Sequence, residues 1–329
     1  MELNKIVERA INLYSQSKYD EALAIYKSVI CKSFPPPVFS VLYYNMGLCN
    51  YALSKFKASE NNFKKSMEFG GECGYDLFLS VINQGNIVEA RDWWIYRSLG
   101  ARKSFPDLPI KRLKVGEIRG KNLLVLNEQG FGDEFMFSRI IQTLSAECIS
   151  ISYQVYEETL PVFQNYLKFD NISYFTDRNL SKNFVDLHDG FCLSGDFFFD
   201  LIDNSYGLGL VQNEVKRWDI GLCWSTNIES KNSGLRSIDP ALILSELQGK
   251  TKVSLQKDKT YEDLDSVNIK SFMDTLEIIQ NCREVWTVDT SVAHIAILSG
   301  AKVKLLYKDY LDWRWKIPIY KGHNLKKIN

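Results

Sequence analysis

The spacing of apolar residues changes once along this 329-residue chain, and the change separates two kinds of structure. Over residues 1–100 apolar side chains recur every three or four positions, which predicts helices. From residue 122 onward, short continuous apolar runs alternate with amphipathic stretches, which predicts parallel βαβ sheets. The segment 101–121 carries Pro106, Pro109 and Gly116 and is expected to be a linker.

Three segments of the helical part share one pattern: a large residue, a small residue three positions later, and an aromatic residue four positions after that. The three sets are Tyr19/Ala22/Tyr26, Phe56/Ser59/Phe63 and Ile87/Ala90/Trp94. Their spacing brackets the roughly 34-residue period of tetratricopeptide repeats. The small residue would let the two helices of a hairpin approach, and Gly47 would do the same in the second hairpin. We therefore predict a tetratricopeptide-like helical array at 1–100, with an unrelated helical bundle as the alternative.

The second part predicts two α/β lobes, at 122–216 and 217–329. The expected strands are 122–127, 148–156, 172–176 and 184–188 in the first lobe, and 220–224, 253–256, 284–288 and 303–306 in the second. The expected helices are 133–144, 240–247, 273–281 and 291–299, and the tract 195–216 is expected to connect the lobes. Two such sheets in tandem leave a cleft at the carboxyl ends of their strands, so ligand-binding residues are expected there.

A glycine-containing motif follows the first strand and opens a helix. Gly130 and Gly132 permit a tight turn and the close approach of a ligand. Asp133 would lie at the mouth of the cleft as a candidate general base, or it would only cap the helix. Glu134 is the nearest substitute for it.

Three further groups of polar residues lie at strand ends in the second lobe. After 220–224 comes a loop with two cations that could hold a diphosphate, although a solvated surface loop would show the same pattern. The next strand ends in polar groups, and a later strand leads into a helix start suited to phosphate. His294, in the first turn of that helix, would either hold the loop by hydrogen bonds or take part in catalysis. The residues concerned are Trp224, Ser225, Lys231 and Arg236, then Gln256 and Lys257, then Asp289, Thr290, Ser291 and His294.

In this order the motifs resemble the glycosyltransferase family that contains the bacterial heptosyltransferases, most closely its tetratricopeptide-fused branch. The resemblance covers about residues 120–320, and the glycine usual after the Trp224 strand is absent. The matching pieces are Asn127–Asp133 with Phe137 and Arg139, Gly221–Ser225 with Lys231-Asn232 and Arg236-Ser237, Val253–Lys257, Phe272–Leu276, Val288–His294 with Ala296 and Gly300, and Asp312–Trp315.

The resemblance implies a GT-B fold and an inverting, metal-independent glycosyltransferase. It implies a nucleotide-sugar donor in the second lobe, bound by the ten residues from Trp224 to His294 named above, and a protein or surface-glycan acceptor facing Gly130, Gly132 and Glu134, with Asp133 as the base. No cofactor or metal is expected, since no Asp-x-Asp pair lies in a credible strand-end loop, and helix amides, Lys231 and Arg236 could neutralise the diphosphate. The helical array would dock the acceptor or a partner, or form a homo-oligomer interface.

Composition excludes several other classes of protein. Lys+Arg and Asp+Glu both total 40, which argues against a dedicated nucleic-acid surface. Seven cysteines without a CxxC pair indicate reduced thiols in a cytoplasmic protein, and the sequence shows neither a signal core nor a transmembrane run. Two other functions remain as alternatives: a catalytically reduced scaffold that binds a partner through its repeats, and a sugar-nucleotide hydrolase or epimerase on the same fold.

Overall fold

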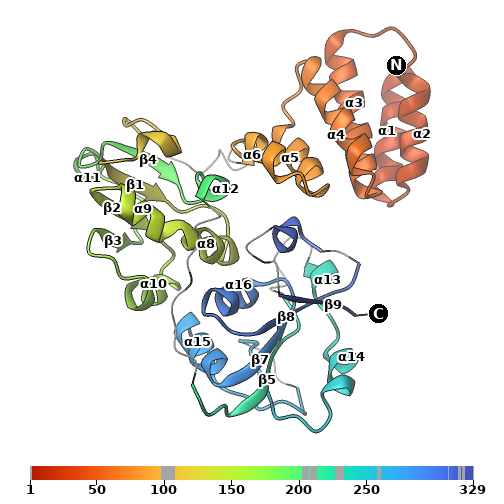
Figure 1. Cartoon of the computed structure of the whole chain (residues 1–329). Coiled ribbons are helices and arrows are strands. Elements are labelled where there is room, and N and C mark those ends of the chain that lie inside the picture. The colour runs from red at the N-terminus through yellow and green to blue at the C-terminus, as the bar shows by residue number, and fades with distance from the viewer. Residues whose placement is uncertain are drawn as a thin grey trace. The chain divides into compact units, whose positions relative to one another are not determined.

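The computed structural model divides into two compact units, Met1–Pro106 and Asp107–Asn329 (Figure 1). The structure describes residues 2–97, 108–201, 207, 213–226, 233–257, 261–309, 311–317, 320 and 323–328. Each unit contains its own cluster of buried apolar side chains.

The first unit is a run of three helical hairpins. Its helices are α1 (Glu2–Ser15), α2 (Tyr19–Val29), α3 (Pro36–Ala52), α4 (Phe56–Glu68), α5 (Gly74–Ile82) and α6 (Ile87–Trp94), and each packs on the next in sequence. Each of the three repeated sets begins the second helix of a hairpin, at Tyr19, Phe56 and Ile87. The expected helical array is present, while its assignment to the tetratricopeptide class stays a prediction.

The small residues of the pattern lie where two helices pack closely. Ala22, Ser59 and Ala90 are fully buried. A Cβ on Gly47 of α3 would lie 2.5 Å from the ring of Phe63 on α4, and Ser59 Oγ donates to the Gly47 carbonyl at 2.9 Å. The sequence pattern therefore encodes close packing within the hairpins.

The second unit begins with a four-stranded parallel sheet in the order β3-β2-β1-β4. Its strands are β1 (Asn122–Leu126), β2 (Ser150–Gln154), β3 (Ile172–Phe175) and β4 (Gly190–Leu193). The helices of this lobe are α8 (Phe131–Phe137), α9 (Ile141–Glu147), α10 (Leu160–Tyr166), α11 (Lys182–Val185) and α12 (Phe198–Leu201).

The prediction of a strand at 184–188 is wrong. Residues 182–185 form the short helix α11, because the Ser181 side chain caps it by accepting from Phe184 N at 3.2 Å. The fourth strand is β4, which begins at Gly190 and pairs with the inner strand β1.

A second parallel sheet of five strands follows, in the order β6-β5-β7-β8-β9. Its strands are β5 (Trp218–Cys223), β6 (Lys252–Ser254), β7 (Cys282–Thr287), β8 (Val303–Tyr307) and β9 (Asn324–Lys327), of which β9 was not expected. The helices are α13 (Ser233–Arg236), α14 (Pro240–Leu244), α15 (Phe272–Gln280) and α16 (Ser291–Leu298), with a 3-10 turn at Trp313–Lys316.

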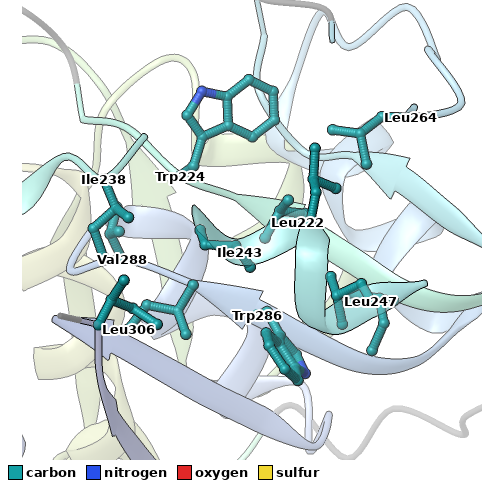
Figure 2. Packing of buried hydrophobic residues seen from close by; sticks show 12 residues of the cluster. Leu222, Trp224, Ile238, Ile243, Leu247, Leu264, Trp286, Val288 and Leu306 are labelled. Atoms are coloured by element: carbon teal, nitrogen blue, oxygen red, sulfur yellow. The ribbon is translucent and has the colours of Figure 1, made fainter. Parts of the chain in front are cut away.

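The core on one side of this sheet consists of aliphatic side chains and tryptophans (Figure 2). Leu222 of β5, Trp286 of β7 and Leu306 of β8 pack with Ile243 of α14 and with Leu247. Burying such side chains stabilises by roughly 1.5–3 kcal/mol each. The core therefore fixes the strands whose carboxyl ends carry the candidate site.

Among the described helices, none has the length and apolarity needed to cross a bilayer.

Candidate active site

The turn after β1 places Asp133 in the first turn of α8. Gln129 adopts a left-handed conformation, with φ of 63°, and Gly130 is the N-cap residue. Asp133 Oδ2 accepts a long hydrogen bond of 3.4 Å from Gly130 N. Asp133 thus helps to cap its own helix.

The two glycines of this motif have different surroundings. A Cβ on Gly132 would lie 2.9 Å from His294 Cδ2 and 3.6 Å from Ser291 Cα, so Gly132 lets α8 pack closely on α16 of the second lobe. A Cβ on Gly130 would meet nothing within 4 Å, and this exposed glycine is the one with open space beside it. Close ligand approach, expected for both, is sterically available only at Gly130.

His294 is buried behind Gly132 and is held on two sides. Its Nδ1 lies 2.6 Å from Tyr320 Oη, and its ring stacks on Trp315 with centroids 4.7 Å apart. Burial, reinforced by the positive charge of Arg314, lowers the pKa of His294 to about 3. A neutral, enclosed imidazole favours the loop-holding interpretation over a catalytic one.

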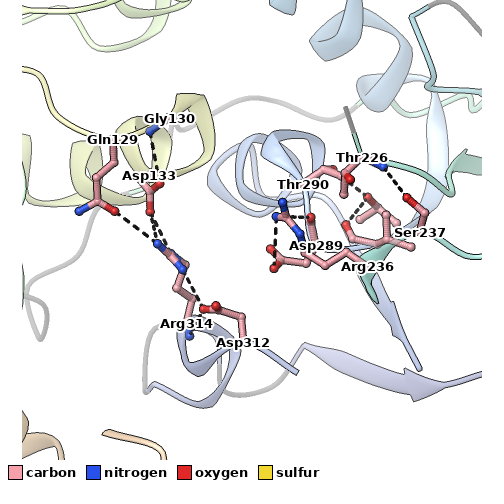
Figure 3. A network of polar contacts seen from close by, with 12 residues as sticks. Gln129, Gly130, Asp133, Thr226, Arg236, Ser237, Asp289, Thr290, Asp312 and Arg314 are labelled. Carbon is pink, nitrogen blue, oxygen red and sulfur yellow. Dashed lines mark hydrogen bonds and ion pairs between the residues drawn. The ribbon is translucent and has the colours of Figure 1, made fainter. Parts of the chain in front are cut away.

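The Asp133 carboxylate is ion-paired with Arg314 from the second lobe (Figure 3). Arg314 Nη2 and Nε lie 2.7 and 2.9 Å from Asp133 Oδ1. Asp312 Oδ1 holds the other side of the guanidinium, 2.9 Å from Nη1. Gln129 Oε1 accepts a longer bond of 3.4 Å from Arg314 Nη2. The candidate base is therefore part of a charge network that joins the two lobes.

A second ion pair lies at the end of β7. Arg236 Nη1 is 3.2 Å from the Asp289 carbonyl and 3.7 Å from Asp289 Oδ2. Burial raises the pKa of Asp289, and the neighbouring Asp312 carboxylate raises it further, while Arg314 and Arg236 oppose the shift. Arg236, expected to bind donor phosphate, is thus already held by Asp289.

The loop after β5 is closed at its base by hydrogen bonds. Gln256 Oε1 accepts from Trp224 N and Ser225 N at 3.0 and 2.9 Å. Thr226 N donates to Ser237 Oγ at 3.1 Å. Gln256 therefore fixes the backbone at Trp224 and Ser225, and its contact with a donor stays a prediction. Lys257 is exposed, and Lys231 lies outside the described residues.

Helix α16 begins with hydroxyl groups that do not cap it. Thr290 is the N-cap residue, but its side chain makes no capping hydrogen bond and instead lies 3.4 Å from Thr287 Oγ1. Ser291 is partly exposed beside it. A helix start without a side-chain cap leaves amides that an anion can bind.

Glu134 faces the interior of the first lobe. It is fully buried, and its Oε1 accepts from Tyr156 N at 3.0 Å. Burial raises the pKa of Glu134 to about 8. Because it is enclosed, Glu134 cannot replace Asp133 at the surface of the site without a rearrangement of α8.

Sequence reasoning missed the residues that hold Asp133 and His294 in place. Arg314 and Asp312 belong to a motif that supported only the family resemblance, and Tyr320 had no local signal at all. The described ranges contain no cluster of three or more His, Cys, Asp or Glu side chains that could hold a metal ion.

No protein-family model and no curated protein sequence matches this chain. Among solved structures, the chain is similar to the iron-containing dodecameric glycosyltransferase TibC of enterotoxigenic Escherichia coli, at 9% identity and a TM-score of 0.48 over 66% of this chain. It spans 63% of the TibC chain.

It is also similar to a family 9 glycosyltransferase from Veillonella parvula, with 12% identity, a TM-score of 0.45, and 64% of this chain and 87% of that chain covered. The E. coli ADP-heptose lipopolysaccharide heptosyltransferase II is similar at 12% identity and a TM-score of 0.44. The match covers 63% of this chain and 90% of that chain. These neighbours are glycosyltransferases.

Proposed function

We propose that this chain is an inverting, metal-independent glycosyltransferase of the GT-B type that moves a sugar from a nucleotide-sugar donor to a protein or glycan acceptor. The observation that carries the proposal is the charge network between the lobes. Asp133, in the first turn of the helix that follows β1, is bound by Arg314 of the other lobe. The charge of Arg314 also acts on Asp289 after β7, which is paired with Arg236. A carboxylate from one lobe thus lies beside a cation from the other, and a cation can stabilise the charge that develops on a phosphate leaving group.

The donor phosphates would bind at the start of α16. The amides of its first turn and the Thr290 and Ser291 hydroxyls lie next to Asp289, whose carbonyl is 3.2 Å from Arg236 Nη1. Lys231, which follows β5 in the sequence, would add a point charge. Together these groups would take up the charge that develops on the leaving diphosphate.

Asp133 would accept the proton of the acceptor hydroxyl as its oxygen attacks the anomeric carbon. The bond between that carbon and the phosphate oxygen breaks, the electron pair leaves with the nucleoside diphosphate, and attack from the opposite face inverts the sugar. A well-placed general base contributes roughly 10²–10⁴-fold to such a step.

One observation favours a second candidate, a scaffold that has lost catalysis. Both oxygens of Asp133 already accept from protein donors, Oδ1 from Arg314 and Oδ2 from Gly130 N. If the contact at Oδ2 persisted when ligand binds, Asp133 would have no oxygen left for the acceptor proton and would only join the lobes.

The test is turnover of a panel of nucleotide-sugars: UDP-glucose, UDP-N-acetylglucosamine, GDP-mannose and ADP-heptose. Release of nucleoside diphosphate is measured with water, cell-surface glycan and total cell protein as acceptors. Binding is measured in parallel by thermal shift, where a nucleotide at 100 times its dissociation constant should stabilise by about 2.7 kcal/mol. An enzyme releases diphosphate in an acceptor-stimulated manner. Binding without release supports the scaffold, and release that no acceptor stimulates indicates a hydrolase.

A further inference from the structure

We propose that Arg314 is the positioning residue for Asp133: it holds one carboxylate oxygen and so directs the other at the acceptor hydroxyl. The inference deepens the proposed function and rests on it.

The first argument is the unequal use of the two carboxylate oxygens. Asp133 Oδ1 accepts a hydrogen bond from Arg314 Nε at 2.9 Å and lies 2.7 Å from Arg314 Nη2. Within the described part of the chain, Oδ2 has only the 3.4 Å contact with Gly130 N. Hydrogen bonds weaken well before that distance, whereas charge-assisted bonds of 2.7–2.9 Å are strong. Oδ2 is therefore the oxygen that can accept a proton without breaking the ion pair.

The second argument is that Arg314 is itself fixed. Asp312 Oδ1 accepts from Arg314 Nη1 at 2.9 Å and from Arg314 N at 3.0 Å. The guanidinium carbon lies 4.9 Å from the centre of the Trp313 ring. The side chains of Arg314, Asp133 and Asp312 are only 17%, 17% and 12% exposed. A guanidinium held on three sides can impose an orientation on its partner.

The third argument is that the same short segment also fixes the helix that carries Asp133. Trp315 stacks on His294, and the His294 ring lies against Gly132, the residue before Asp133. Asp312–Trp315 thus controls both the carboxylate and its backbone. One set of contacts holds the Asp133 side chain and the other holds the neighbouring residue Gly132, and both act on the alignment of the base.

The experiment measures kcat and donor KM for four variants. Arg314→Gln removes the positive charge, and Arg314→Lys keeps the charge but cannot donate from two nitrogens to Asp133 Oδ1. Asp312→Asn weakens the ion pair that holds the Arg314 guanidinium. The control is Arg283→Gln, which removes the Arg283–Asp219 ion pair, whose two members lie toward the amino-terminal ends of β7 and β5, away from the site. The assay is nucleoside diphosphate release from whichever sugar of the four-member panel the parent turns over.

We expect Arg314→Gln to lower kcat about 10- to 100-fold and to change donor KM less than threefold, with Arg314→Lys and Asp312→Asn in between and the control at parental rate. The decisive readout is non-additivity: in an Asp133→Asn background, Arg314→Gln should lower kcat less than twofold further. A residue that acted only on folding or on the donor would keep its full effect there.

Three results overturn the inference while leaving the proposed function intact. They are a parental kcat in Arg314→Gln, a rise in donor KM alone, and a full additional loss in the Asp133→Asn background. If Arg314→Gln fails to fold, Arg314→Lys and Asp312→Asn decide by the same criteria. A parent that binds nucleotide but turns over no member of the panel with any acceptor overturns the proposed function and this role together.

Discussion

Gly132→Ala tests whether the second glycine of the motif is a packing residue. The new Cβ would lie 2.9 Å from His294 Cδ2, whereas carbon atoms in good contact are about 3.5–4.0 Å apart. Either α8 or the imidazole must therefore move by at least about 0.6 Å. The ring cannot move freely, because Tyr320 Oη lies 2.6 Å from its Nδ1 and Trp315 stacks on its face.

The expected cost follows from two opposing effects. Overpacking a buried contact costs about 1–3 kcal/mol, and replacing glycine by alanine returns about 0.4–1 kcal/mol by restricting the unfolded chain. The net loss should be about 0.5–2 kcal/mol, which lowers the melting temperature by roughly 1–8 °C for a unit of this size. Because Asp133 is the next residue, a shift of this order should also lower turnover, by up to about 100-fold for a 1 Å displacement.

The assay is thermal unfolding together with diphosphate release. The matched control for the stability measurement is Gly130→Ser, since a Cβ there meets nothing within 4 Å and serine is a preferred N-cap residue. It should change stability by less than about 0.5 kcal/mol. Combining Gly132→Ala with His294→Ala should give a smaller loss than the sum of the two single losses, because the ring that clashes is gone. Full additivity, or a Gly132→Ala variant as stable and active as the parent, would refute the packing role.

Two further predictions concern charged groups. Glu60 of α4 is buried, which acts to raise its pKa, but hydrogen bonds from Lys64, Gln84 and Lys57 outweigh burial and lower the pKa to about 2. The ionised Glu60 carboxylate therefore stabilises the fold fully above pH 4.5, and this stabilisation is lost as pH falls toward 2. The melting temperature should decline over that window in the parent and decline less in Glu60→Gln. Equal slopes in both proteins would contradict this prediction. Arg236→Ala and Lys231→Ala should each weaken nucleotide binding by about 1.5–3 kcal/mol without unfolding the protein. By calorimetry this is a rise in the dissociation constant of about 10- to 150-fold. Unchanged affinity in both variants would show that these two residues do not bind the donor phosphates.

Local patterns predicted the elements whose signals lie within a few residues. The three large–small–aromatic sets begin α2, α4 and α6, because spacing along one helix directly reflects the face that packs. The continuous apolar run predicted at 122–127 forms the inner strand β1 (Asn122–Leu126), with the glycine turn and helix α8 after it.

The fourth strand of the first sheet could not be predicted in the same way. β4 has four residues and begins at Gly190, where a Cβ would lie 2.6 Å from Leu113 Cγ and from the Lys111 carbonyl. Close packing by residues far away in the sequence, and not strand propensity, defines it. The apolar residues of 184–188 predicted a strand, but residues 182–185 form the helix α11, which the Ser181 side chain caps.

The partners of the candidate site were hidden for a related reason. Arg314 lies 181 positions from Asp133, and Tyr320 lies 26 positions from His294. The spacing of residues in one segment carries no information about such pairs. The sequence therefore pointed to Asp133 and the helix start at Thr290, but not to the residues that hold Asp133 in place.

The most direct test of the central claim is diphosphate release from the nucleotide-sugar panel by the parent and by Asp133→Asn, with the acceptor that stimulates the parent most. Asparagine keeps the size of the side chain and an oxygen that can accept from Gly130 N. Asp133→Asn should therefore fold, bind nucleotide with parental affinity, and lose about 99% or more of its transfer rate, in line with a general-base contribution of at least 10²-fold. Near-parental turnover by Asp133→Asn would show that Asp133 only caps α8 and joins the lobes, and would contradict its assignment as the base.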